Sequence, residues 1–320
     1  MSELTHDLML HHLQSIDGHQ IILFTTSTAN AELVQFLSDD FNFEICMRKL
    51  SLKDQLKVRN SQHNRIKELG LRLFSKYVLN YIVYIQGGSP SFDPWAELPM
   101  EYNKYGKPQL KNQNILNFQY NSSSSNDIIS IVVLINSSSS VGIDLSHETQ
   151  DSISATDFMD QFQGIFTSHE QNQLMEIDNI EERYVAFNHF WTLKEAFTKF
   201  IGCGLNVDLA KISFHLTDEK LELRGSIPSE KGLVTGYNVK WLEGIEVEYS
   251  ELANEFRTNF NHHHYKVYCS SAVLRAEDKL PVIVTVISPH DNIKKSKNFH
   301  FDMGRLVEGL VDTDLVNGTR

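Results

Sequence analysis

The sequence has few cysteines, no long apolar run and no excess of positive charge, and each absence excludes a class of protein. Its three cysteines, Cys46, Cys203 and Cys269, lie far apart in 320 residues, which excludes a disulfide framework or a zinc cluster and favours a reducing compartment. No apolar run approaches the ~20 residues that cross a bilayer. The formal net charge of −12 argues against a general nucleic-acid-binding protein, which would normally be basic.

The first residues, MSELTHDLMLHHL, contain acids but neither an arginine nor an apolar core, so we expect no signal or transit peptide. A chain of 320 residues with 41% hydrophobic residues can bury one large core or two medium ones. The sequence therefore predicts a soluble cytoplasmic protein, with neither a membrane nor a nucleic acid among its partners.

Both halves of the chain mix strand patterns with helix patterns. The strands are predicted over His19–Thr26, Ile128–Ile135, 211–216, 220–225, 262–274 and 281–287. The helices are predicted over 51–76, 154–175 and 179–201. Two serine runs, 122–125 and 137–140, are typical of surface loops.

The second serine run is the predicted seam between two lobes. We expect an N-terminal lobe of residues 1–138 and a C-terminal lobe of residues 139–320. The weakly patterned tail after about Lys294 is expected to be partly disordered.

The charge of the chain changes sign between Ser51 and Lys76. This window holds seven Lys or Arg against two acids, a net charge of +5. Because the whole chain carries −12, the remaining residues carry −17. Such a run is often only the solvated face of a helix. A concentrated basic window in an acidic chain also indicates an anion-binding site, and both interpretations stay open.

The segment NHFWTLKEAFTKFIGCGL, Asn188–Leu205, places charges on a mostly apolar helix. Trp191, Glu195 and Lys199 fall at i, i+4 and i+8 on one stripe, with Lys194 beside them. Glycines at 202 and 204 are predicted to end the helix. Taken alone, Glu195 and Lys199 are an ordinary ion pair worth a few tenths of a kcal/mol.

A second candidate lies in VGIDLSHE, where Asp144 stands on a short apolar segment. A carboxylate in this setting can ligate Mg²⁺, which takes one or two carboxylates together with phosphate oxygens and waters. The alternative is an aspartate that caps a turn or a helix. Asp144 and Glu195 are 51 residues apart, so only the fold can bring them together.

Taken in order, YGKPQL, NFQYNSSSSND, VGIDLSHE, FTSHE and FWTLKEAFTKFIGCGL resemble the 4′-phosphopantetheinyl transferases. The similar class is the large, two-lobed one that serves aminoadipate reductase, fatty acid synthases and peptide synthetases. Its strongest motif, W-x-x-K-E-A-x-x-K, matches Trp191–Lys199, and the resemblance covers about residues 59–205.

The resemblance implies an α/β (α+β) fold of two similar lobes related by a pseudo-twofold axis. Each lobe would be a small, mostly antiparallel sheet packed with helices, with coenzyme A in the cleft between them.

The resemblance also implies a reaction. A carrier-protein serine attacks the β-phosphate of coenzyme A, takes over the phosphopantetheine arm and releases adenosine 3′,5′-bisphosphate. By analogy, Asp144 holds Mg²⁺, and Glu195 completes the metal site, takes the serine proton, or does both. Lys194 and Lys199 are expected to face phosphate oxygens and the charge on the leaving group.

The first lobe is expected to supply the rest of the coenzyme A site. By resemblance, Lys107 and Pro108 of the G-K-P motif lie along the adenine nucleotide. Arg65 is the best match for a cation on the 3′-phosphate, with Arg59 and Arg72 as neighbours. Because carrier domains are themselves acidic, the basic window is an alternative docking site for the partner.

Two departures from the family pattern affect the site. Where the family usually shows F-N-x-S-H-S, this chain has FQYNSS, so Asn121 or Ser122 offers only neutral hydrogen bonds in place of a histidine. Bacterial members often have a second acid two residues after the aspartate, where this chain has Ser146. Mg²⁺ can keep an extra water there.

The leading hypothesis is a monomeric transferase that modifies an apo carrier domain, with aminoadipate reductase of lysine synthesis as the candidate partner. The alternative is a degenerate relative that binds coenzyme A or carrier protein without turnover. The missing histidine and Ser146 favour it, whereas the intact Asp144, Lys194, Glu195 and Lys199 oppose it. A nucleotide hydrolase is a third class, and neither a P-loop nor a nucleophile elbow supports it.

Overall fold

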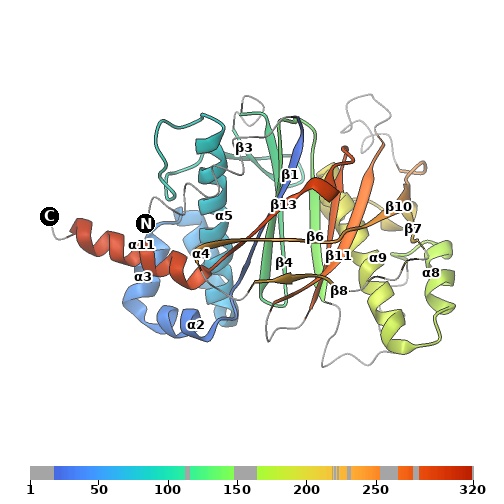
Figure 1. Cartoon of the computed structure of the whole chain (residues 1–320), viewed down its shortest axis with the longest axis horizontal. Coiled ribbons are helices and arrows are strands. Elements are labelled where there is room, and N and C mark those ends of the chain that lie inside the picture. The colour runs from blue at the N-terminus through green and yellow to red at the C-terminus, as the bar shows by residue number, and fades with distance from the viewer. Residues whose placement is uncertain are drawn as a thin grey trace.

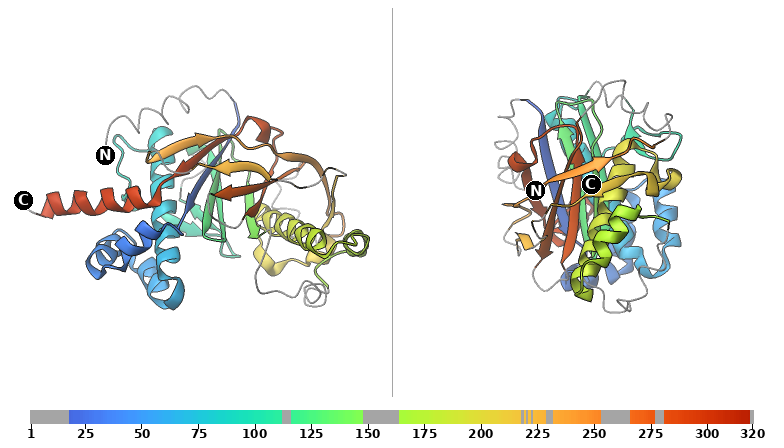
Figure 2. Two further views of the ribbon diagram at one scale, coloured as in Figure 1. Left: turned by 60° about the horizontal axis from the view of Figure 1, so that its bottom comes forward. Right: turned by 90° about the vertical axis from the view of Figure 1, so that its right-hand side faces the viewer.

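Two β-sheets lie face to face in the middle of the molecule, and helices cover the outer face of each (Figure 1). The structure is a computed structural model that describes residues 18–111, 116–147, 164–217, 219, 221, 223–228, 232–252, 266–276 and 281–318. The layers run helix, sheet, sheet, helix, and the views in Figure 2 show the same order. No helix in these ranges combines the length and apolarity that a membrane crossing requires.

The first sheet has the strand order β4-β5-β1-β13-β9. Its strands are β1 (Gln20–Ser27), β4 (Phe118–Ser125), β5 (Ile128–Ile135), β9 (Val234–Tyr237) and β13 (Lys297–Phe301). The helices on this side are α2 (Ala31–Ser38), α3 (Asp40–Arg48), α4 (Leu52–Asn60), α5 (Arg65–Ile85) and α11 (Met303–Gly318). A separate two-stranded sheet consists of β2 (Met100–Tyr102) and β3 (Pro108–Leu110).

The second sheet has the order β6-β12-β11-β10-β7, with β8 paired to β11. Its strands are β6 (Gly142–His147), β7 (Ser213–His215), β8 (Leu223–Ile227), β10 (Leu242–Glu248), β11 (Tyr268–Ala276) and β12 (Val282–Ser288). Its helices are α8 (Ser168–Met175) and α9 (Ile180–Ile201). Short 3₁₀ turns complete the chain: η1 (Gln62–Asn64), η2 (Gly204–Asn206), η3 (Leu209–Lys211) and η5 (Ile293–Lys295).

The apolar sequence of β5 explains why this strand is covered on both faces, by helices on one side and by the second sheet on the other. All eight of its residues are buried, so both faces of this strand need an apolar partner. Ile129, Ile131 and Val133 point to the helical core of the first half, whereas Val132 and Leu134 belong to the core shared with the second sheet. The prediction of a mixed α/β fold, with mostly antiparallel sheets packed with helices, is confirmed. The pseudo-twofold relation between the halves stays a prediction.

The first serine run was predicted to be a surface loop, and the structure shows that this was wrong. Residues 122–125 are the second half of β4, and each pairs with a residue of β5. Strand pairing uses backbone groups, so serine does not prevent it. The small side chains also suit the position, because β4 runs beside β6 where the two sheets meet.

The predicted helix over residues 51–76 is two helices, α4 and α5. The chain turns at residues 61–64, where Gln62 has a positive φ of 41°. Of the helix predicted over residues 154–175, only the end lies in the described part of the chain, as α8. The strands predicted near 20–26 and 128–135, and the helix over 179–201, are observed within one or two residues.

The segment after Lys294 contains the end of η5, then β13 and α11, and the expected partial disorder of this tail stays a prediction. β13 lies between β1 and β9, and the first turns of α11 bury Leu306 and Val307 in the first core. The division at residues 138 and 139 stays a prediction as a domain boundary. The structure nevertheless adds β9, β13 and α11 to the first half, because strand pairing joins segments regardless of chain position.

Candidate active site

The contact between β6 and α9 requires a glycine at residue 142. A Cβ atom there would lie 2.1 Å from the carbonyl oxygen of Ala196 and 2.8 Å from Cβ of Phe200, closer than any real contact. Because side chains alternate along a strand, residues 144 and 146 share the face that approaches α9. The glycine thus allows the helix to come close enough to contact Asp144.

Asp144 contacts the catalytic candidates of α9. Its Oδ1 accepts hydrogen bonds from Nζ of Lys199 at 2.6 Å and from Oγ of Ser123 at 2.8 Å. Lys199 also donates to Ser123 at 3.0 Å. The Asp144 side chain is 8% exposed and that of Lys199 is 27% exposed. The fold therefore joins β4, β6 and α9 in one polar cluster whose members are distant in sequence.

Glu195 lies near the same cluster on a half-buried position of α9. Burial raises the pKa of its carboxyl group, the charge of Asp144 raises it further, and Lys199 opposes the shift. A carboxylate whose charge raises the pKa of Glu195 is close enough to it for electrostatic coupling. The structure thus brings Asp144, Glu195 and Lys199 together, as expected.

The donor set of this cluster fits Mg²⁺. Two carboxylate oxygens from β6 and α9 are hard ligands, and a divalent cation would relieve the repulsion that raises the pKa of Glu195. Ser146 adds no ligand here, because its hydroxyl donates to Oδ1 of Asn188 at 2.8 Å. In the described ranges no three His, Cys, Asp or Glu residues converge on a metal site, so substrate phosphates and water would have to complete the coordination.

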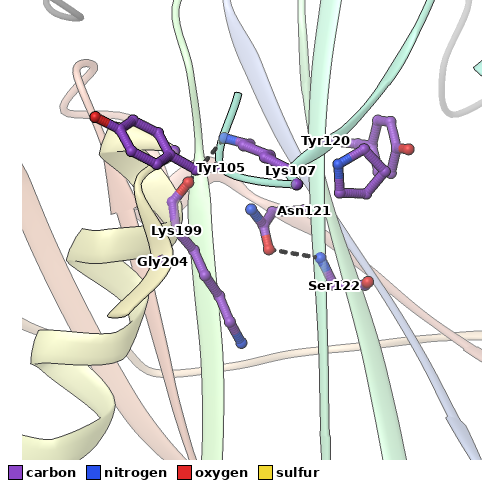
Figure 3. Close-up of a pocket in the computed structure, with 10 residues that line it drawn as sticks. Tyr105, Lys107, Tyr120, Asn121, Ser122, Lys199 and Gly204 are labelled. Atoms are coloured by element: carbon purple, nitrogen blue, oxygen red, sulfur yellow. Dashed lines mark hydrogen bonds between the residues drawn. The ribbon is translucent and has the colours of Figure 1, made fainter. Parts of the chain in front are cut away.

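A cavity of about 250 Å³ opens beside this cluster (Figure 3). Three segments line it: the turn before β3, the middle of β4 and the end of α9. The lining residues are Tyr105, Gly106, Lys107, Pro108, Tyr120, Asn121, Ser122, Lys199, Gly202 and Gly204. Its volume is near the lower end of small-molecule sites, so coenzyme A would fill it with only part of its length. Lys107, Pro108, Asn121, Ser122 and Lys199, predicted from the sequence, share this one cavity.

Lys107 spans the boundary between the halves. Its Nζ donates to Oγ of Ser140 at 2.7 Å and to the backbone oxygen of Lys199 at 2.8 Å, and Figure 3 shows the side chain directed toward α9. Burial lowers the pKa of Lys107 to about 8. The ammonium group is thus held by two neutral oxygens, without a counter-charge among these contacts, and an anionic ligand would stabilise it.

The structure contradicts the expectation that Lys194 faces phosphate oxygens. Its side chain is 0% exposed and pairs with the equally buried Glu170 at 2.8 Å. The other two N–H groups are used by the carbonyls of Leu209 and Ile212. Consecutive helical residues point about 100° apart. When Glu195 points toward Asp144, Lys194 therefore points into the core. Lys194 therefore stabilises the fold of the second half.

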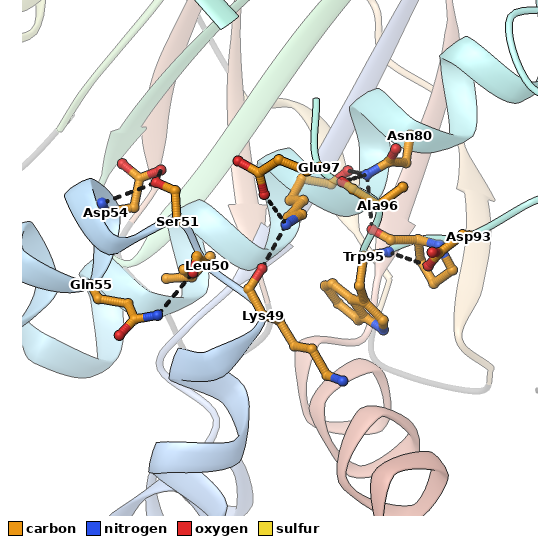
Figure 4. A network of polar contacts seen from close by, with 12 residues as sticks. Lys49, Leu50, Ser51, Asp54, Gln55, Asn80, Asp93, Trp95, Ala96 and Glu97 are labelled. Atoms are coloured by element: carbon orange, nitrogen blue, oxygen red, sulfur yellow. Dashed lines mark hydrogen bonds and ion pairs between the residues drawn. The ribbon is translucent and has the colours of Figure 1, made fainter. Parts of the chain in front are cut away.

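Part of the basic window pairs with acids. Arg59 lies 3.2 Å from Glu44, and Arg72 lies 2.9 Å from Glu68. Figure 4 shows Asp54 and Glu97 in the polar network around this window, where they contact Arg72 and Lys76 respectively.

Arg65 is the exposed first residue of α5, and its guanidinium group lies 4.5 Å from the centre of the Phe43 ring. It is absent from the lining of the cavity. The structure thus does not unite Arg65 with the other site residues, and its contact with the 3′-phosphate stays a prediction.

Sequence reasoning missed four residues of the site. Ser123 was hidden in a serine run interpreted as a loop, although it contacts both Asp144 and Lys199. Ser140 and Asn103 contact the lysine of the G-K-P motif and the end of α9. Tyr105 lines the cavity. The asparagine three residues before a glycine in NKYG was a detectable turn signal.

Comparisons with known proteins agree with these observations. Residues 140–233 match the model of the 4′-phosphopantetheinyl transferase superfamily. This range contains β6 and α9, which carry Asp144, Glu195 and Lys199.

Three fungal relatives carry the name L-aminoadipate-semialdehyde dehydrogenase-phosphopantetheinyl transferase. The chain is 28% identical to the Saccharomyces cerevisiae protein over 56% of its own length and 62% of that protein. It is 25% identical to the Candida glabrata protein over 73% of its length and 84% of that protein. It is 31% identical to the Eremothecium gossypii protein over 59% of its length and 62% of that protein. The chain thus spans less than two thirds of the first and third relatives.

Proposed function

We propose that this chain, whose residues 140–233 match the 4′-phosphopantetheinyl transferase superfamily, transfers the phosphopantetheine arm of coenzyme A to a serine of an apo carrier protein. The serine oxygen forms a bond to the β-phosphorus of coenzyme A. The bond from that phosphorus to the bridging oxygen breaks, and adenosine 3′,5′-bisphosphate leaves with the electron pair.

The observation that best supports this proposal is that two ammonium groups line one cavity and two carboxylates lie beside one of them, Lys199. Asp144 and Glu195 are electrostatically coupled, and Lys199 connects them to the lining of the cavity. Lys107 enters from the other half. Phosphoryl transfer depends mainly on positioning and on stabilising charge, and this arrangement offers both.

Glu195 is the proposed proton acceptor. Its carboxylate is half-buried and lies near Asp144 and Lys199, where it can take a proton and later release it. The serine proton would pass to Glu195 directly or through one water.

Mg²⁺ is the proposed cofactor, with Asp144 and Glu195 as its protein ligands. When bound, it would stabilise negative charge on the pyrophosphate oxygens. Lys199 would contribute a second positive charge near the leaving group. Ser123, which bonds both Asp144 and Lys199, would keep the two side chains oriented.

The nucleotide end of coenzyme A is proposed to lie at the hairpin and β4. Lys107 would pair with a phosphate oxygen, and Pro108 and Tyr120 offer apolar surface to the adenosine. Asn121 and Ser122 would donate neutral hydrogen bonds where the family usually has a histidine.

The carrier domain of L-aminoadipate-semialdehyde dehydrogenase is the proposed partner, on the strength of the names of the fungal relatives. Both walls of the cavity come from one chain, so a monomer suffices. A cytoplasmic location is proposed with this partner, as expected from the cysteine content.

The test is intact-mass spectrometry of an apo carrier domain incubated with the protein, coenzyme A and Mg²⁺, with and without EDTA. We expect a magnesium-dependent gain of ~340 Da, the mass of a covalently attached phosphopantetheine arm. Coenzyme A binding without any gain across several carriers would instead support the degenerate, non-catalytic relative.

A further inference from the structure

The hairpin formed by β2 and β3 belongs to neither large sheet, yet it supplies four residues to the cavity, residues 105–108. A strand within a sheet is positioned by its neighbours' backbone hydrogen bonds. Among the described residues this hairpin has no such pairing with the two large sheets, so the side-chain contacts of the hairpin help to set the position of Lys107 relative to α9.

Asn103 makes hydrogen bonds in two directions. Its Oδ1 accepts from the backbone N–H groups of Tyr105 and Lys107, both at 2.9 Å, which closes the turn of the hairpin. Its Nδ2 donates to the backbone oxygen of Gly202 at 2.7 Å. The first pair of bonds shapes the turn, and the last bond fastens it to the end of α9, 99 residues later.

The C-terminal end of α9 leaves the backbone oxygen of Gly202 accessible to the Asn103 side chain. Gly202 caps the helix in the left-handed conformation, with φ of 73°, and the last carbonyls of a helix lack partners within it. A Cβ atom on Gly202 would lie 3.1 Å from Nδ2 of Asn103 and 3.3 Å from Cδ of Lys107. The hairpin therefore lies directly against the glycine, three residues beyond Lys199.

We propose that Asn103 is a positioning residue, which clamps the hairpin turn to the end of α9 so that Lys107 and Lys199 face one coenzyme A cavity at a fixed separation. This inference deepens the proposed function and rests on it for the identity of the ligand. Asn103 does not line the cavity, so it acts through Lys107 and through the last turn of α9.

The test compares Asn103→Asp with Asn206→Asp. In Asn103→Asp one carboxylate oxygen still accepts from the two turn N–H groups, but the other faces the Gly202 oxygen, so only the clamp is lost. Asn206 donates from Nδ2 to the backbone oxygen of Cys203 at 2.8 Å, a bond within one turn. Its aspartate variant adds the same charge next to Gly204 without separating the hairpin from α9.

Coenzyme A affinity is measured by calorimetry at 0.15 and 0.5 M NaCl, because high salt suppresses a through-space charge effect. We expect Asn103→Asp to weaken the affinity about tenfold relative to the unmodified protein at both salt concentrations, the effect of losing one buried hydrogen bond. The coenzyme A affinity of Asn206→Asp should stay within about twofold of that of the unmodified protein at 0.5 M NaCl. The KM for coenzyme A should rise in Asn103→Asp, while the KM for the carrier protein stays unchanged.

Equal affinities of the two variants, or a loss that disappears at 0.5 M NaCl, would overturn the proposal. Amide hydrogen exchange of the ligand-free proteins separates this result from a failure of the proposed function. Faster exchange of residues 103–110 in Asn103→Asp than in Asn206→Asp supports the clamp even if the unmodified protein transfers nothing, and identical exchange contradicts it.

Discussion

At the scale of single residues, Lys107 in the cavity lining and Glu195 near Lys199 are two groups whose pKa the fold shifts toward neutral pH. Burial acts on both, and it disfavours the charged form of each. It raises the pKa of Glu195 and lowers that of Lys107 to about 8. Both groups would therefore change charge closer to neutral pH than they do in water.

The substitution Glu195→Gln should separate chemistry from binding. Glutamine keeps the size of the side chain but accepts no proton, so we expect kcat to fall about 10²–10⁴-fold, with coenzyme A affinity nearly unchanged. Steady-state kinetics and calorimetry check this. A variant that loses binding but keeps its turnover per bound complex would contradict the role of Glu195.

The affinity for coenzyme A should fall as the pH rises above about 8. Lys107 loses its proton near that pH in the folded protein, and only the protonated form attracts a phosphate. The free energy of unfolding of the unliganded protein should change in the opposite direction. The unfolded chain keeps the Lys107 proton up to the ordinary lysine pKa, so the stability of the folded protein increases with pH between about 8 and 10.5.

The measurement is the dissociation constant of coenzyme A between pH 7 and 9.5, with Lys107→Arg as the control. Arginine stays protonated throughout, so its profile should be flat above pH 8. If the variant and the unmodified protein show the same pH dependence, Lys107 is not the titrating group.

At the scale of elements, α9 and β6 carry the site. The Asn179 side chain caps α9 at its start, and Gly202 caps it at its end, so the predicted glycine end of the helix is confirmed. Residues on one side of the helix meet β6, and Lys194 points into the core behind it. Consecutive residues of the helix therefore face different surroundings, one toward the candidate site and one toward the core.

The variant Gly142→Ala should destabilise the protein, because the new Cβ would overlap the Ala196 carbonyl group of α9. Overpacking of this kind typically costs about 1–3 kcal/mol, and a backbone obstacle cannot rotate away. Urea denaturation measures the loss, with Gly309→Ala as the matched control, since nothing lies within 4 Å of a Cβ atom there. An unchanged unfolding midpoint would show that α9 does not press on β6.

Lys194→Met should destabilise the fold by about 3–5 kcal/mol, because it leaves the buried Glu170 without its partner. The double variant Lys194→Met/Glu170→Gln removes both charges and should recover most of this loss. Urea denaturation of both variants tests the pair. A single variant that keeps its stability but loses coenzyme A affinity would restore the original prediction that Lys194 binds phosphate.

At the scale of the whole molecule, the cavity lies where the two sheets meet. β4 of the first sheet runs beside β6 of the second, and the hairpin reaches across to α9. Neither half contains a complete set of candidate groups. A ligand that contacts both walls should therefore stabilise the whole chain.

Mg²⁺ should raise the melting temperature by on the order of 3 °C at a concentration about tenfold above its dissociation constant. The shift should shrink at acidic pH, since protons compete for Glu195, whose pKa is raised. Asp144→Asn should abolish it, whereas Glu246→Gln, an exposed acid on β10, should not. A shift that survives Asp144→Asn would place the cation elsewhere.

The sequence by itself determined which residue types are available and which local elements form. The apolar run 128–135, the capped helix over 179–201, and the order of the motifs all follow from neighbours along the chain, where periodicity and turn chemistry act. On their own these left the roles of Asp144, Glu195 and Lys199 open, and the resemblance of the motifs to the 4′-phosphopantetheinyl transferases selected these residues and the G-K-P turn.

Only the tertiary structure decided which of these residues share one site. Lys194 and Lys199 are both lysines of one motif, but the rotation of α9 against β6 buries the first with Glu170 and brings the second to Asp144. Ser123 and Asn103 gained their roles through partners 21 and 99 residues away. Such contacts depend on packing between segments that are distant in the sequence, and local sequence patterns do not predict which distant segments pack together.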